Sequence, residues 1–133
     1  MKLPVYNIST SDVNGPGNRL VIWVQGCPLH CKGCFNSQTH SFQGGELINV
    51  EDLVRKINSM GNIDGVTFSG GEPLMRTDLV ECGRNLTLRG YSWGMVTNGL
   101  LLTQRKIAEL ANAGLKSISI SLDGLETYHN HFR

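Results

Sequence analysis

The chain alternates between strand-like and helix-like segments, and this alternation limits the possible folds more than any other feature of the sequence. Short segments rich in β-branched and aromatic residues indicate strands, and apolar residues recur at helical spacing between them. The predicted strands are Arg19–Gln25, Gly65–Ser69, Tyr91–Thr97 and Ser117–Leu122, and the predicted helices are Asn49–Met60, Thr77–Leu88 and Thr103–Ala113, with another beginning near Leu125. Strands that alternate with helices over short connections pair in parallel, so we expect an α/β fold, a partial βα barrel with about four parallel strands and helices on its outer face.

Length and composition fit one domain over residues 1–133. Hydrophobic residues make up 40% of the chain and charged residues 17%, which are ordinary values for a globular protein. The formal net charge of +1 gives no reason to expect nucleic acid or an anionic membrane as a partner. No apolar run approaches the roughly 20 residues that span a bilayer, and the N-terminus lacks the apolar region of a secretory signal. We therefore expect a cytoplasmic, reducing location, where clustered cysteines are more often ligands or catalysts than disulfides.

An unusual loop follows each predicted strand. The first strand runs into a cysteine cluster, the second into SGGEP, the third into TNG and the fourth into DG. The carboxyl ends of parallel strands meet at one edge of the sheet, where such folds bind their ligands. The last strand also alternates, and its polar face ends in Ser121 and Asp123. This polar face indicates a surface left open for a ligand, although serines that fill a narrow barrel interior would give the same pattern.

Three of the four cysteines lie close together. Cys27, Cys31 and Cys34 follow the spacing C-x3-C-x2-C within GCPLHCKGCFN. Three thiolates on a tight loop can hold an iron–sulfur cubane and leave one iron open, as a catalytic centre requires. The alternative is a zinc ion with His30 as fourth ligand, but His30 adjoins Cys31 and zinc signatures usually have a second pair of ligands downstream. Cys82 lies on the apolar stripe of a predicted helix, so we expect it to be a buried small side chain.

The ordered set of the cysteine motif, GGEP, TNG and SLDG resembles the radical S-adenosylmethionine enzyme superfamily, essentially from Gly15 onward. The resemblance implies a 4Fe–4S cluster on Cys27, Cys31 and Cys34, with S-adenosylmethionine on the open iron. In that superfamily one electron breaks a carbon–sulfur bond of the cofactor, and the resulting 5′-deoxyadenosyl radical abstracts hydrogen from the substrate. The resemblance also implies a flavodoxin or ferredoxin as electron donor.

The resemblance further implies a set of cofactor contacts. The backbone of Gly70 and Gly71 can approach the methionyl amino group, Glu72 complements its charge, and Pro73 stiffens the turn. A branched side chain at Gly71 should then weaken S-adenosylmethionine binding without removing the cluster. The remaining candidates are Thr97, Asn98 and Asp123 for the ribose hydroxyls or the methionyl carboxylate, Phe35 for the adenine, and Gly33 and Ser121.

Two parts of the chain point to different substrates. Many members of the superfamily carry an aromatic residue where this chain has Gly33. CKGCFN and the upstream NGPGNR resemble the activating enzymes that install glycyl radicals, including those that serve anaerobic ribonucleotide reductase. The C-terminal half resembles members that modify peptides or small molecules. A protein or peptide substrate is expected, and its identity stays open; a non-enzymatic iron–sulfur or zinc-binding module is the remaining alternative, against which the intact GGEP argues.

The number of predicted strands has a consequence of its own. Barrels of this superfamily commonly contain more βα units than the four predicted here, and the cofactor motifs all fall on these four. We therefore expect residues 1–133 to be the N-terminal, cofactor-binding part of a barrel that is truncated at its C-terminus or borrows a wall from a partner. The sheet should be open, with four strands, an uncovered last strand and a cofactor site open to solvent.

Overall fold

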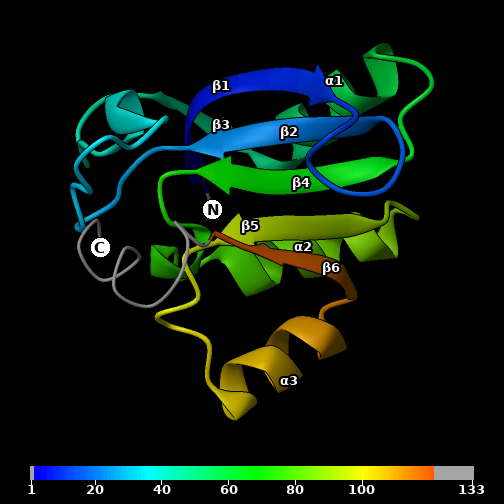
Figure 1. Ribbon diagram of the computed structural model, residues 1–133. Coiled ribbons are helices and arrows are strands. Elements are labelled where there is room, and N and C mark those ends of the chain that lie inside the picture. Colours follow the sequence, from blue (N-terminus) through cyan, green and yellow to red (C-terminus); the bar gives the residue numbers. More distant parts are fainter. Residues whose placement is uncertain (1, 122–133) are drawn as a thin grey trace.

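The structure is a computed structural model that describes residues 2–121 as one mixed sheet with helices packed against one of its faces (Figure 1). Four strands are parallel, namely β2 (Arg19–Val24), β4 (Gly65–Gly70), β5 (Trp93–Thr97) and β6 (Leu115–Ile120). The helices α1 (Val50–Ser59), α2 (Leu79–Leu88) and α3 (Gln104–Asn112) lie between them in the chain. The predicted α/β fold with parallel strands and outer helices is therefore confirmed. No helix within the described residues is long and apolar enough to cross a membrane.

The sheet is larger than predicted. Its strand order is β3-β1-β2-β4-β5-β6, in which β1 (Lys2–Ser11) and β3 (Glu46–Asn49) are antiparallel additions beside β2. The expected sheet of four strands thus has six. The prediction for the last strand was also displaced, since β6 begins and ends earlier than Ser117–Leu122. The helix expected near Leu125 lies outside the described residues.

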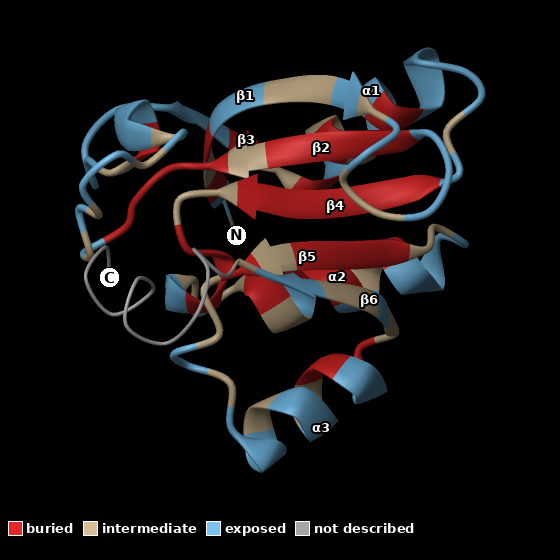
Figure 2. Ribbon diagram, in the orientation of Figure 1, coloured by how far each residue is buried: buried red, intermediate tan, exposed pale blue. Residues whose placement is uncertain are grey.

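The core lies between the sheet and the helices. Strand alternation directs one face of β2, β4 and β5 toward the helices. Nearly every residue of β2 and β4 is buried, as the red colour of these strands in Figure 2 shows. The aromatic rings of Phe68 and Trp93 pack edge to face with centroids 5.8 Å apart. Cys82 is enclosed in this core, and burial raises the pKa of its thiol to about 12. Its predicted role as a small buried side chain is confirmed.

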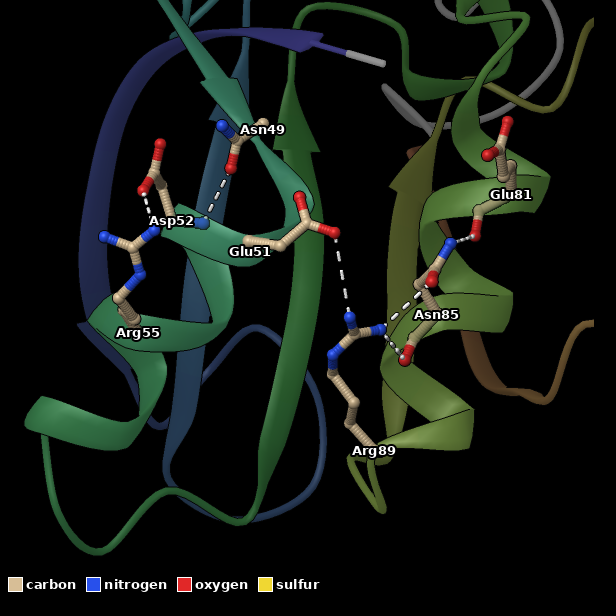
Figure 3. A network of polar contacts seen from close by, with 7 residues as sticks. All are labelled: Asn49, Glu51, Asp52, Arg55, Glu81, Asn85 and Arg89. Atoms are coloured by element: carbon tan, nitrogen blue, oxygen red, sulfur yellow. Dashed lines mark hydrogen bonds and ion pairs between the residues drawn. The ribbon is translucent and has the colours of Figure 1, made fainter.

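Polar contacts on the outer surface join α1 to α2 (Figure 3). Glu51 and Arg89 form an ion pair at 3.8 Å, and the Arg89 guanidinium also donates to the Asn85 side chain at 3.0 Å. Exposed pairs of this kind contribute only about 0–1 kcal/mol. The two helices are therefore held against the sheet mainly by their apolar faces.

The β1–β2 loop closes one end of the opposite face of the sheet. Thr67 donates from Oγ1 to the Asn14 carbonyl at 2.7 Å, and the Arg19 guanidinium donates to Thr67 Oγ1 at 3.1 Å. The Asn18 amide donates to Asp64 Oδ2 at 2.7 Å. These contacts place NGPGNR at the amino ends of β2 and β4, away from the edge where the motif-bearing loops gather (Figure 1).

Candidate functional site

The carboxyl ends of the parallel strands open onto one cleft of about 620 Å³, a size typical of small-molecule sites. The cleft brings together loops that are far apart in the chain, as predicted for the edge of a parallel sheet. Pro73 is not among the lining residues, and Asp123 lies outside the described residues. The other predicted site residues all line the cleft: Cys27, Cys31, Gly33, Cys34, Phe35, Gly70, Gly71, Glu72, Thr97, Asn98 and Ser121.

The cysteine loop, residues 27–34, supplies the thiols. None of the three cysteines forms a disulfide; Cys27 is buried, whereas Cys31 and Cys34 are partly exposed. Burial raises the pKa of the Cys27 thiol, and the negative charge of Glu72 raises it further. A polar site that combines several thiols with a nearby carboxylate is well suited to a cationic metal centre, because the cation compensates the clustered negative charge.

The zinc alternative gains no support from the geometry. Across residues 2–121, no three His, Cys, Asp or Glu side chains converge closely enough to hold a single metal ion. The ring of His30 instead packs edge-on against His40, with centroids 5.0 Å apart. The three thiols nevertheless line one cleft, and a cubane, which is larger than one ion, would need them less close together.

The glycine turn after β4 packs directly on the residue that precedes Cys27. The Gly71 amide donates to the Val24 carbonyl at 2.9 Å, and the Glu72 amide donates to the Gly26 carbonyl at 3.0 Å. A Cβ added to Gly71 would lie 2.3 Å from the Gly26 carbonyl oxygen. Glycine is therefore required at position 71 because the turn lies close to the backbone of Gly26. This packing fixes the start of the cysteine loop against the SGGEP turn.

Glu72 joins two neighbouring strand ends. The residue is only 2% exposed. Carboxylate Oε1 accepts hydrogen bonds from Thr97 Oγ1 at 2.6 Å and from the Leu74 amide at 3.0 Å, while Oε2 accepts one from the Asn98 amide at 2.9 Å. Glu72 thus holds the TNG loop against the SGGEP turn while its negative charge stays at the cleft. The Thr97 hydroxyl, predicted to face the cofactor, is engaged by this carboxylate and by the Gly99 amide at 3.2 Å.

The rim of the cleft is more open than its floor. Phe35 is 98% exposed, so its predicted packing on an adenine ring depends on a ligand being present. Ile120 also lines the cleft and is half exposed, although alternation had placed it on the apolar face of its strand. Sequence reasoning missed this residue together with other lining residues: Lys32, Asn36, His40, Ser69 and Val96. Of these, Ser69 could have been found, since it ends a predicted strand at the ligand-binding edge.

Glu72→Gln should loosen the contact between these two strand ends. The substituted amide places a donor opposite a backbone donor, either the Leu74 amide or the Asn98 amide, and a buried polar group left unpaired costs about 1–3 kcal/mol. Urea denaturation of the metal-free protein should show this loss of stability, and the Asn98 amide should exchange faster. Thr97→Ser keeps the hydroxyl and should behave like the wild type. Equal stability of Glu72→Gln and wild type would contradict the role of Glu72 in holding the two strand ends together.

Residues 13–129 match the family described as 4Fe-4S single cluster domain. The chain belongs to the radical S-adenosylmethionine (radical SAM) superfamily. A 4Fe–4S cluster and S-adenosylmethionine are the typical cofactors of radical SAM proteins. The resemblance inferred from the ordered motifs is thereby confirmed.

The radical SAM relatives act on different molecules. The chain is 37% identical over 120 residues to the AdoMet-dependent heme synthase of Methanosarcina barkeri, covering 86% of this chain and 34% of that protein. It is also 37% identical over 102 residues to the PqqA peptide cyclase of Rhodopseudomonas palustris, covering 75% of this chain and 27% of that protein. The chain therefore spans about a third of the length of these curated relatives.

A solved structure shares the fold. The crystal structure of QueE from Escherichia coli superposes with a TM-score of 0.65 at 24% sequence identity, covering 74% of this chain and 54% of that one. At this identity the likeness concerns the radical SAM fold alone.

Proposed function

We propose that this chain forms the cofactor-binding part of a radical SAM enzyme that cleaves S-adenosylmethionine and abstracts hydrogen from a polypeptide substrate. The observation that carries the proposal is that three thiols, the SGGEP turn and the TNG loop all line one cleft. A bound 4Fe–4S cluster would supply the electron that cleaves the cofactor, and the protein supplies position and shielding. A flavodoxin or ferredoxin is the proposed electron donor.

The residues of the cleft divide the task of binding. Cys27, Cys31 and Cys34 would hold three irons and leave the fourth open to the cofactor. Glu72 would attract the positively charged methionyl amino group, because its carboxylate is negative and lies at the cleft. The exposed ring of Phe35 is a candidate platform for the adenine, since this residue lines the cleft and is 98% exposed.

A polypeptide substrate is supported by two observations. One similar protein is named a peptide cyclase. Four residues of the sheet beside the cleft are also uncharged: Trp23 pairs in register with Ser69, and Val96 pairs with Ser119. The charged residue of β2, Arg19, is buried at the far end of the strand. These uncharged side chains can contact peptide backbone and neutral side chains.

Activation of a glycyl radical in a partner protein is the alternative suggested by CKGCFN and NGPGNR. NGPGNR makes its contacts with Thr67, Val66 and Asp64 at the end of the sheet away from the cleft. The contacts of NGPGNR within the sheet are enough to explain its presence. It therefore adds little support for a glycyl-radical partner.

The proposed activity is tested by anaerobic reconstitution with iron and sulfide, followed by a 5′-deoxyadenosine assay with a chemical reductant. We expect formation of 5′-deoxyadenosine by the wild type and none by Cys31→Ala. A uniformly deuterated peptide mixture should transfer deuterium into the product. An iron-loaded wild type that forms no 5′-deoxyadenosine would contradict the activity. Deuterium transfer only from a large glycyl-radical enzyme would overturn the peptide assignment in favour of the alternative.

A further inference from the structure

The cysteine loop has no regular secondary structure. Its backbone bond within the thiol region runs from the Cys34 amide to the Cys31 carbonyl at 3.2 Å. A metal centre held by such a loop depends on groups outside the ligand set to orient its thiolates. Such groups lie at the base of the loop.

The base is formed by a return segment, residues 38–41, which runs back past the end of β2. Its four consecutive carbonyls all accept hydrogen bonds from residues 25–27. The Gly26 amide donates to the Thr39 carbonyl at 2.7 Å, and the Cys27 amide donates to the His40 carbonyl at 3.0 Å. The first thiol ligand is thus attached through its own backbone amide.

Gln25 supplies the two outer bonds of this set. Its side-chain Nε2 donates to the Gln38 carbonyl at 3.3 Å and to the Ser41 carbonyl at 2.7 Å, on either side of the two backbone bonds. The residue is only 5% exposed, and its backbone amide donates to the Pro4 carbonyl of β1 at 3.0 Å. A neutral amide provides two N–H donors, and both are used here. Glu would present oxygen to these carbonyls, and Leu would present no donor.

The return segment also reaches the third thiol. Thr39 is fully buried, and its Oγ1 donates to the Asn36 carbonyl at 2.6 Å. The Asn36 amide in turn donates to Cys34 Sγ at 3.4 Å. Hydrogen bonds that are joined by short stretches of backbone therefore link Gln25, the return segment and Cys34.

We infer that Gln25 is a positioning residue for the cluster, which fixes both ends of the cysteine loop through the return segment. The inference rests on the proposed function in one respect, namely that the cysteine loop holds an iron–sulfur cluster. The position of the loop in the metal-free protein is independent of that proposal and is tested separately below.

The first test compares the reconstituted wild type with Gln25→Leu, which keeps the size of the side chain and removes both donors. Loss of partners outside the ligand set commonly lowers metal affinity about 10–100-fold. We expect iron release to a chelator to be at least about 10-fold faster in Gln25→Leu, and the electron paramagnetic resonance signal of the reduced cluster to change. Gln38→Ala is the matched control, because it removes an exposed side chain and keeps the carbonyl that Gln25 contacts. Wild-type release and an unchanged signal in Gln25→Leu would overturn the inference.

The second test uses hydrogen exchange in the metal-free protein. Gln25→Leu should speed exchange of the Gly26 and Cys27 amides and leave the Leu86 amide in α2 unchanged. Equal acceleration at all three would show a merely structural loss of stability and would overturn the positioning role. If Gln25→Leu does not fold, Gln25→Met also removes both donors, and the same two outcomes apply to it. A wild type that never takes up a cluster would contradict the proposed function, while this exchange measurement would still decide the role of Gln25 at the base of the loop.

Discussion

Replacing Cys27, Cys31 or Cys34 with Ala will abolish the visible absorbance of the anaerobically reconstituted protein, which in the wild type should hold about four irons per chain as one cubane. Each thiolate would hold one iron, and the fourth iron would have no protein ligand. No further protein ligand could therefore replace a lost thiolate. Iron analysis and absorbance spectra of the three variants measure this loss directly. The effect should be nearly complete in each.

Cys82→Ala is the matched control for the thiol substitutions. Cys82 lies in the core between α2 and the sheet, where burial raises the pKa of its thiol to about 12. Its replacement should cost about 1 kcal/mol through a small cavity and leave the absorbance intact. A cluster that survives Cys31→Ala but is lost in Cys82→Ala would contradict the ligand assignment.

Gly71→Val should destabilise the protein by about 3 kcal/mol or more and lower its iron content. The added Cβ would lie 2.3 Å from the carbonyl oxygen of Gly26, so either the SGGEP turn or the start of the cysteine loop must move. Sequence reasoning predicts a weaker S-adenosylmethionine site with an intact cluster for this variant. The contact with Gly26 changes that expectation, because Cys27 follows Gly26 directly. Urea denaturation and iron analysis after reconstitution measure both losses.

Gly61→Val separates close packing from backbone strain. Gly61 has a positive φ of 75°, and a Cβ added there meets nothing within 4 Å. This control should lose only about 1–2 kcal/mol from the left-handed backbone and should keep its iron. If Gly71→Val matches Gly61→Val in stability and in iron content, the packing of Gly71 on Gly26 does not constrain the cysteine loop.

The parallel part of the fold could be predicted because its signals are local. Strand alternation, helical spacing and the turn residues after each strand all fall within short windows. The strand β1 was missed because Pro4 and the polar residues that follow it do not indicate a strand. A shift in register between Val5 and Asn7 also breaks the alternation of β1. The strand β3 was missed because its four residues run directly into α1.

Part of the candidate site could be predicted from the sequence and part could not. The residues that line the cleft could be predicted because chain order alone places the loops after parallel strands at one edge. The bonds between those loops could not, because Glu72 meets Asn98 only through the pairing of β4 with β5. Gln25 likewise meets the Ser41 carbonyl only after the cysteine loop has turned back. Such partners depend on tertiary placement, and nothing in their local sequence marks them.

The position of β6 has a consequence for the thermodynamics of the cleft. Within residues 2–121, β6 pairs with β5 alone, and none of its residues is buried. Strands with few buried contacts open locally at a lower free energy than the core. Yet Ile120 and Ser121 form one wall of the cleft. A ligand that contacts this wall binds only when β6 is paired with β5, so it stabilises the paired state by mass action. The local opening of β6 and the binding of a ligand in the cleft are therefore linked equilibria.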